Sequence, residues 1–162
     1  MMLKQYKHIQ VAVDGSKEAK IAFAKAVEVA KRNKAELEIV HVIDTRAFQD
    51  ISSFDSEMVE QVTKDVKERI KGYYQEAKDA GIENVNYNIE YGSPKNILAH
   101  KFPEEHNIDL IIIGATGLNA VERILIGSIT EYVTRTADCD VLVIREPAAQ
   151  TEDIKNNKEN NN

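Results

Sequence analysis

The stretch Ile111-Ile112-Ile113-Gly114-Ala115-Thr116-Gly117 decides the fold of this chain, and Gly127-Ser128-Ile129-Thr130 follows it after nine further residues. The apolar run ends in a glycine turn, and the second glycine opens a helix whose first turn carries hydroxyl groups. A parallel α/β sheet uses this arrangement to present backbone N–H groups at the carboxyl end of a strand, where phosphates bind. The two stretches therefore predict a parallel sheet with an anion site at one edge.

The spacing of these glycines matches neither of the common phosphate-binding signatures. No lysine follows Gly127, so G-x-x-x-x-G-K-[ST] is absent, and Gly114 with Gly117 does not complete G-x-G-x-x-G. Turn glycines are common after buried strands because they adopt φ > 0 easily, and Ser128 could be an ordinary helix cap. The helix start at Gly127 favours a ligand site, since its N–H groups and positive dipole end face the same edge.

Outward from this stretch, the hydrophobic pattern predicts alternating strands and helices. Short apolar runs predict strands at 8–13, 37–43, 85–91, 109–113 and 140–145. Helical spacing of apolar residues predicts helices over 17–33, 56–80, 94–105 and 127–137, with loops at 45–55 and 114–126. We therefore predict an α/β fold: a single-domain, open five-stranded parallel sheet, doubly wound and Rossmann-like, with helices on both faces.

Capping residues support these helix boundaries. Ser16 is a suitable N-cap for the first helix, and Gly81 is a suitable stop for the second. Ser93 and Pro94 predict the start of the third helix, with the serine as cap and the proline in the first turn. Pro103 predicts a weakened end for that helix.

The run 109–113 is apolar at every position after its first residue, which predicts a strand covered on both faces. The strand 85–91 alternates instead and should have one wetter face. In sheets of this kind, ligands bind outside the carboxyl ends of the strands, where the winding reverses. The strand ends to consider are Val13-Asp14, Val42-Ile43-Asp44, Tyr91-Gly92 and Ile113-Gly114.

The composition limits the classes of partner. A net charge of −6 argues against a nucleic-acid surface and against an anionic membrane surface, but allows a nucleotide ligand. The single cysteine, Cys139, fits a reducing compartment, and we find neither a signal peptide nor a membrane span, so we expect a cytoplasmic protein. Residues 1–146 are expected to form one domain, and the polar, Asn-rich residues 147–162 a disordered tail.

The pattern Gly114-x2-Gly117-x9-Gly127-Ser128 resembles the ATP-binding motif G-x2-G-x9-G-[ST] of the universal stress protein family. The opening segment Val11-Ala12-Val13-Asp14-Gly15-Ser16 and the closing segment Val141-Leu142-Val143-Ile144 also resemble that family. So do His41-Val42-Ile43-Asp44 and Gly92-Ser93-Pro94. The resemblance covers nearly the whole chain before the tail, and it implies the adenine nucleotide alpha hydrolase-like version of the Rossmann-like fold.

The resemblance implies an ATP site and assigns its residues by position. Asp14 and the backbone around Val13 would hold the ribose and adenine, and the Val42 backbone would read the adenine edge. Ile113, Gly114 and Gly117 would form the phosphate loop. The triphosphate cradle at the helix start would comprise Gly127, Ser128, Ile129 and Thr130. Mg²⁺ would be bound through the phosphates, with Asp14 as a possible neighbour.

Other chemistry-bearing residues have competing interpretations. Asp14 stands where a carboxylate could accept from a ribose hydroxyl, but it could also cap the first helix beside Ser16. Arg123, between the glycines, could screen phosphate charge, although a solvated role beside Glu122 is favoured. The four histidines have no metal-ligand spacing, and no catalytic residue is predicted.

The sequence predicts binding with little or no hydrolysis. The turn Gly15-Ser16 differs from the S-G-G-x-D-S loop of related adenylating enzymes, and no lysine clamp or general base accompanies the phosphate loop. A weak ATPase or nucleotide hydrolase of the same fold is the alternative. A third reading is a protein-interaction dimer without nucleotide.

The last strand predicts an interface. The segment Val141–Ile144 would lie at a sheet edge, where a long apolar strand is a pairing hazard unless it is covered. The family resemblance implies a homodimer formed there by antiparallel pairing across a twofold axis. The alternative is an edge blunted by Arg145 and the tail.

Overall fold

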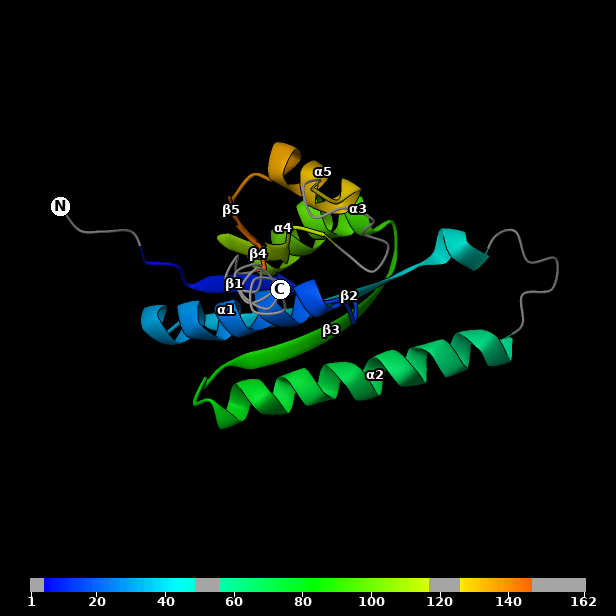
Figure 1. Ribbon diagram of the computed structural model, residues 1–162, viewed down its shortest axis with the longest axis horizontal. Helices are drawn as coiled ribbons and strands as arrows, with labels where there is room; N and C mark the ends of the chain where they lie inside the picture. The colour runs from blue at the N-terminus through cyan, green and yellow to red at the C-terminus, as the bar shows by residue number, and fades with distance from the viewer. Residues whose placement is uncertain (1–4, 49–55, 117–125, 147–162) are drawn as a thin grey trace, which may run out of the picture.

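The computed structural model describes residues 5–48, 56–116 and 126–146. Its sheet has the order β3-β2-β1-β4-β5, and every neighbouring pair is parallel. The strands are β1 (His8–Ala12), β2 (Glu36–Asp44), β3 (Val85–Gly92), β4 (Leu110–Gly114) and β5 (Asp140–Ile144). The predicted open five-stranded parallel sheet is thus confirmed (Figure 1).

Helices cover both faces of this sheet. The longer ones are α1 (Lys17–Asn33), α2 (Ser56–Asp79) and α5 (Ser128–Thr136). The segment between β3 and β4 contains α3 (Pro94–Asn96), a π-helical turn, η2 (Ile97–Lys101), and α4 (Phe102–His106). None of the helices in the described ranges is long and apolar enough to cross a membrane.

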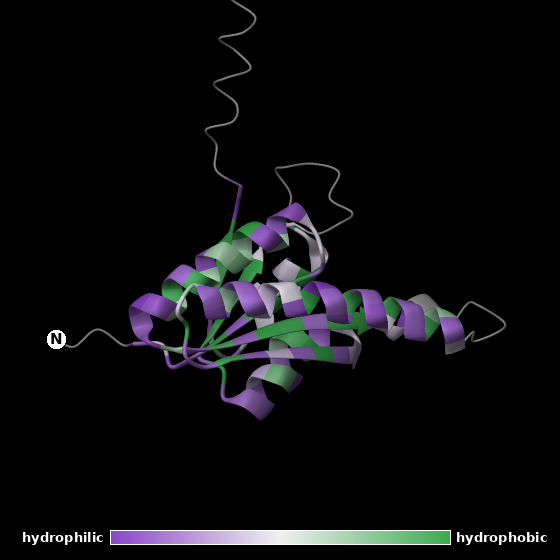
Figure 2. Cartoon of the chain, turned by 90° about the horizontal axis from the view of Figure 1, so that it is seen from below, coloured by the Kyte–Doolittle hydropathy of each residue, from purple (hydrophilic) through white to green (hydrophobic). Residues whose placement is uncertain are grey.

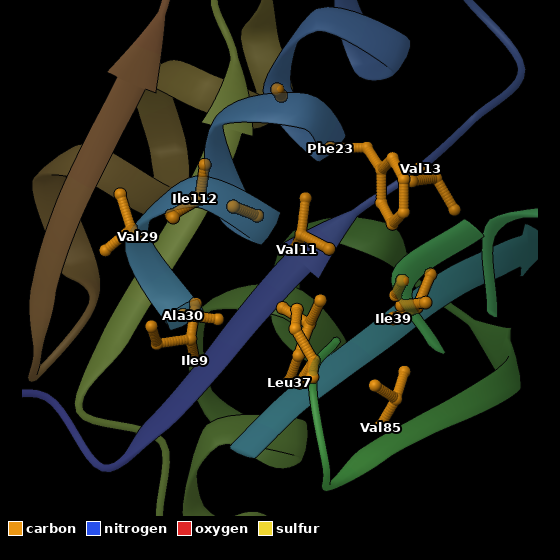
Figure 3. Packing of buried hydrophobic residues seen from close by; sticks show 14 of the residues in the cluster. Ile9, Val11, Val13, Phe23, Val29, Ala30, Leu37, Ile39, Val85 and Ile112 are labelled. Atoms are coloured by element: carbon orange, nitrogen blue, oxygen red, sulfur yellow. The ribbon is translucent and has the colours of Figure 1, made fainter. Parts of the chain in front are cut away.

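Two apolar clusters hold the layers together. On one face, Ile9, Val11, Leu37 and Ile39 pack against α1 and α2, with Phe23 of α1 fully buried (Figure 3). On the other, Val40, Ile111 and Ile113 pack with Phe102 and Val133 from α4 and α5. Neighbouring residues of one strand therefore enter different clusters, as the period of two requires. Figure 2 shows the hydrophobic residues along the strands between the helices.

The strands occupy the positions that their sequences predict. All five residues of β4 are buried, as the uninterrupted apolar run requires. β5 lies at one edge and β3 at the other. On β3, Tyr87 and Ile89 pack on the α1/α2 cluster, whereas the side chains of Asn86 and Asn88 bond to Glu38 of β2, so the wetter face is confirmed.

Helix starts and stops follow the local chemistry with two exceptions. Ser16 caps α1 by accepting from the Ala19 N–H at 3.1 Å, and Gly81 follows α2 with φ +98°. Ser93 is an N-cap without a side-chain hydrogen bond. The predicted helix over 94–105 is present and continues past Pro103 to His106, but it contains the wide turn η2, where the Phe102 N–H donates to the Ile97 carbonyl, one residue further back than in an α-helix.

The predicted loop at 45–55 is partly helical. Thr45–Phe48 forms a 3₁₀ turn, η1, in which the backbone N–H of Arg46 donates once and its guanidinium twice to the Asp44 carboxylate. The rest of that loop lies outside the described residues. So do Gly117, Arg123 and the predicted tail at 147–162.

Candidate functional site

The winding of the sheet reverses between β1 and β4. From β1 the chain runs outward through β2 to β3, then crosses to β4 and continues to β5. β1 is hydrogen-bonded to β2 on one side and β4 on the other. The carboxyl ends of β2, β1 and β4 therefore lie in succession along one edge, where ligands of such sheets bind. This edge contains Val42, Asp14 and Gly114, as the sequence predicts.

The start of α5 is fastened to the end of β4. The Gly127 N–H donates to the Ala115 carbonyl at 2.8 Å, and the buried Thr130 hydroxyl donates to the Gly114 carbonyl at 2.7 Å. Ala115 in turn donates to the Ile144 carbonyl of β5 at 2.8 Å. These bonds hold the first turn of α5 beside the glycine that ends β4.

Several of the predicted donors therefore have structural partners. The Gly127 N–H already donates to the Ala115 carbonyl, and the Thr130 hydroxyl already donates to the Gly114 carbonyl, so neither donor is free to bind an anion. The first bond within α5 is donated by the Glu131 N–H to Gly127 at 2.9 Å. The N–H groups of Ser128, Ile129 and Thr130 precede it and form the positive end of the helix.

The N-cap of α5 is Gly127, so the prediction that Ser128 might be an ordinary cap is wrong. Gly127 has φ −58° and ψ 152°, a conformation open to any L-residue. A glycine is therefore not needed here for its backbone angles. Glycine is also favoured at an N-cap, and it allows close approach by another group.

Gly114 has a structural reason to be glycine. A Cβ at this position would lie 3.1 Å from the backbone carbon and oxygen of Glu18, in the first turn of α1. β4 and α1 therefore meet in tight contact at this point. Glu18 also carries a buried carboxylate oxygen, Oε2, that has no hydrogen-bond partner among the described residues.

Asp14 is half-buried at the turn between β1 and α1. Its Oδ1 accepts from the Ser16 N–H at 2.9 Å, an Asx turn that precedes α1, whereas the N-cap of α1 is Ser16. Gly15 follows with φ +84°, and the guanidinium of Arg69 from α2 lies against it, with Nη1 2.7 Å from the place of a Cβ. A side chain at position 15 would need Arg69 to move.

The carboxyl end of β2 contributes a histidine to the same edge. Burial lowers the pKa of His41, and its hydrogen bond to the Val13 backbone acts in the opposite direction. The charge of Arg69 lowers that pKa further, and the charge of Asp14 raises it. The core or rim position predicted for His41 is confirmed by its partial burial.

Arg69 could not be found from the sequence. It lies one residue before the buried Ile70 on an otherwise charged stretch of α2, and no motif marks it. Its place beside Gly15 depends on how α2 packs across the sheet. In the described ranges, no three His, Cys, Asp or Glu side chains form a group able to hold a metal ion.

Comparison with known proteins assigns the architecture to one family. The model of the universal stress protein family matches residues 5–145. A universal stress protein of Staphylococcus haemolyticus is 49% identical over 140 residues, covering 86% of this chain and 85% of the relative. The solved structure of the universal stress protein UspA from Lactobacillus plantarum is 35% identical with a TM-score of 0.80, covering 88% of this chain and all of that one.

Two more distant structures contain nucleotides. A universal stress protein in complex with cAMP has a TM-score of 0.66 at 22% identity, over 88% of this chain and 98% of that one. The universal stress protein from Archaeoglobus fulgidus in complex with dAMP has a TM-score of 0.61 at 23% identity, over 88% of this chain and all of that one. At these identities the likeness demonstrates a shared fold.

Proposed function

This chain belongs to the universal stress protein family, and from that premise we propose that it binds ATP with Mg²⁺ at the carboxyl edge of its sheet. Binding would change its surface or assembly and so signal a stress state in the cytoplasm, with little or no hydrolysis. The observation that carries the proposal is the first turn of α5, which Thr130 fastens to Gly114 at the end of β4 and Gly127 fastens to the next residue, Ala115. An anion beside that turn meets N–H groups and the positive end of the helix dipole.

The proposal divides the site into two parts. The adenosine part comprises Val13, Asp14 and the backbone at Val42. The phosphate part comprises Ile113, Gly114, Gly117, Gly127, Ser128, Ile129 and Thr130. In the phosphate part, Thr130 would contribute its backbone N–H, since its hydroxyl donates to the Gly114 carbonyl. Gly114 would contribute indirectly, because its lack of a side chain lets β4 pack closely on α1.

Relatives support an adenine nucleotide in particular. Two family members have been solved with cAMP and with dAMP, which share the adenine base and a phosphate. A triphosphate is favoured here by the G-x2-G-x9-G-[ST] spacing of Gly114, Gly117, Gly127 and Ser128. Mg²⁺ would be held here as a phosphate-bound ion, with the half-buried Asp14 carboxylate as one candidate oxygen donor.

The described basic residues near this edge favour retention of ATP over its hydrolysis. Lys17, at the start of α1, is paired with Glu146 at 2.5 Å, and Arg69 lies against Gly15. Phosphoryl transfer uses a cation on the transferred phosphate and a positioned base. Lys17 is held by Glu146, and neither Lys17 nor Arg69 can act as the base, so we expect turnover to be slow or absent.

We further propose a homodimer through β5. This edge strand alternates between exposed and partly buried residues, and Leu142 is 36% exposed on it. Antiparallel pairing of two β5 edges would satisfy their free backbone groups and cover that leucine.

The identity of the ligand can be tested on the purified protein. We expect denaturation to release an adenine nucleotide detectable by chromatography, and Mg-ATP to raise the melting temperature of the stripped protein. The absence of both would contradict the proposal. Steady-state phosphate release that far exceeds one turnover per bound ATP would instead favour the weak ATPase.

A further inference from the structure

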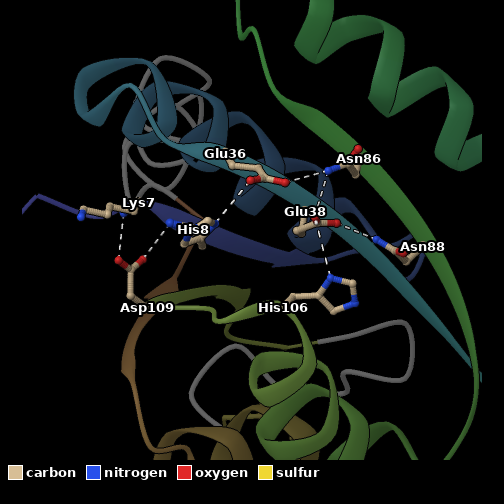
Figure 4. A network of polar contacts seen from close by, with 8 residues as sticks. All are labelled: Lys7, His8, Glu36, Glu38, Asn86, Asn88, His106 and Asp109. Atoms are coloured by element: carbon tan, nitrogen blue, oxygen red, sulfur yellow. Dashed lines mark hydrogen bonds and ion pairs between the residues drawn. The ribbon is translucent and has the colours of Figure 1, made fainter.

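A polar network lies at the opposite ends of the strands from the proposed nucleotide site. It joins the amino-terminal halves of β2 and β3 to the end of α4 (Figure 4). Glu38 of β2 is at its centre and is only 5% exposed. Its carboxylate accepts from Asn86 Nδ2 at 3.0 Å and from Asn88 Nδ2 at 2.7 Å. His106 Nδ1 lies 3.9 Å away.

A pocket of about 520 Å³ opens at this network. Its lining combines Glu38, Asn86, Asn88 and His106 with Tyr74, Val85 and Tyr87 around the edge strand β3. Tyr74 and Tyr87 meet edge to face, with ring centroids 5.5 Å apart. His106 is held by stacking on Phe102, with centroids 3.9 Å apart. The pocket is therefore bounded by side chains that are themselves fixed.

The network has an excess of acceptors over donors. Asn86 gives one N–H bond to Glu36 at 2.9 Å and one to Glu38, so its amide donors are used. Beneath the pocket lining, Gln10 of β1 is fully buried and in register with Glu38; it donates to the Leu98 carbonyl, and its Oε1 has no partner among the described residues. Buried acceptors without donors are rare in folded proteins.

In the part of the chain that the structure describes, no lysine or arginine side chain is paired with Glu36 or Glu38. Over the described ranges, the only ion-pair partners of Glu36 and Glu38 are His8 at 3.4 Å and His106 at 3.9 Å, which carry charge only when protonated. Burial raises the pKa of Glu38, and the donors from Asn86 and Asn88 lower it again. A buried carboxylate without a fixed cation favours a positively charged ligand.

We propose that this pocket binds a small organic cation that carries a primary ammonium or guanidinium group. Such a group brings several donors and one positive charge, which are the two quantities that the network lacks. Glu38 is its counter-ion, and Asn88 and His106 line the pocket on the same face of the sheet. The site is separate from the nucleotide site and does not depend on that proposal.

The test is a titration of the full chain with agmatine, which carries both groups, followed by ¹H–¹⁵N NMR and calorimetry. We expect saturable shifts centred on the side-chain amides of Asn86 and Asn88. Glu38→Gln should weaken binding at least tenfold, since it removes the charge at nearly constant shape. Glu104→Gln, an exposed carboxylate change on α4, should leave affinity unchanged although it alters the net charge equally.

A second variant keeps the test decisive if Glu38→Gln does not fold. Asn88→Lys places an ammonium of the chain itself beside Glu38, so it should fold and abolish agmatine binding. The proposal would be overturned if the wild type and Asn88→Lys bound agmatine equally well. It would also be overturned if Glu104→Gln and Glu38→Gln lost affinity equally, because either result would mean general attraction to an acidic surface. The absence of saturable shifts at millimolar agmatine would overturn it as well.

Discussion

Gly114 and Gly127 belong to one spacing pattern, yet they are glycines for different physical reasons. At Gly114 a methyl group would press on the backbone of Glu18, which cannot move without shifting α1. At Gly127 the backbone angles suit any residue. A substitution at Gly114 therefore tests packing, and a substitution at Gly127 tests the approach of a ligand.

The first prediction uses this difference. Gly127→Val should leave the melting temperature of the nucleotide-free protein within a few degrees of the wild type and reduce Mg-ATP affinity at least tenfold. Gly114→Ala should lower the free energy of unfolding by about 1–3 kcal/mol, because overpacking forces a backbone shift. Denaturant unfolding and calorimetry measure the two effects. Unchanged ATP affinity in Gly127→Val would refute its place in the phosphate cradle.

A second prediction at this scale concerns His41. Burial lowers its pKa below the ordinary value of 6.5, so the unfolded chain binds the proton more readily. The contribution of His41 to stability is therefore complete above pH 6.5 and is lost as pH falls from there through the lowered pKa. The difference in unfolding free energy between the wild type and His41→Gln should shrink over that window. A constant difference from pH 7.5 to 5 would contradict the burial argument.

At the scale of elements, one side chain fastens α5 to β4. The Thr130 hydroxyl is the buried donor to Gly114. Thr130→Val keeps the shape but removes this donor, so it should cost about 1–3 kcal/mol of unfolding free energy. Thr134→Val is the matched control, since Thr134 donates to a carbonyl of its own helix from a less buried position. Equal losses of unfolding free energy in the two variants would show that the hydrogen bond between α5 and β4 stabilises the fold no more than a bond within the helix.

The edge strand β5 yields a prediction about assembly. Leu142→Lys places a charge at the centre of the proposed interface, and we expect it to produce monomers in sedimentation equilibrium. Met58→Lys is the control, because Met58 is 47% exposed on α2, away from that edge. A wild-type protein that is monomeric at every concentration, or a dimer that survives Leu142→Lys, would rule out the β5 interface.

The elements were predictable from sequence where a single pattern governs them. The apolar run 109–113 predicts the buried strand β4, and the alternation over 85–91 predicts a strand with one polar face. The turn η2 was not predictable, since it depends on how Phe102 packs beneath the sheet.

The sequence predicts where the backbone segments of the site lie, but it does not predict the contacts between them. Strand ends and the helix start follow from Asp14, Val42, Gly114 and Gly127 because local patterns fix them. The bond from Gly127 to Ala115 and the contact of Arg69 with Gly15 arise only when distant segments meet. Gly117 stays a prediction, because it lies outside the described residues.

At the scale of the whole molecule, the two ends of one sheet have different chemistry. The carboxyl edge presents N–H groups and a helix start, which suit an anion. The amino-terminal halves of β2 and β3 present buried acceptors around Glu38, which suit a cation. Parallel strands separate these sites by the length of the sheet.

Binding of ATP at the carboxyl edge can be followed residue by residue in a ¹H–¹⁵N NMR titration of the nucleotide-stripped protein with Mg-ATP. We predict saturable shifts that are largest at the amides of Ser128, Ile129 and Thr130, with further shifts at Asp14 and Val42. Saturation should occur at one ATP per chain. No saturable shifts, or shifts confined to other parts of the molecule, would contradict the account.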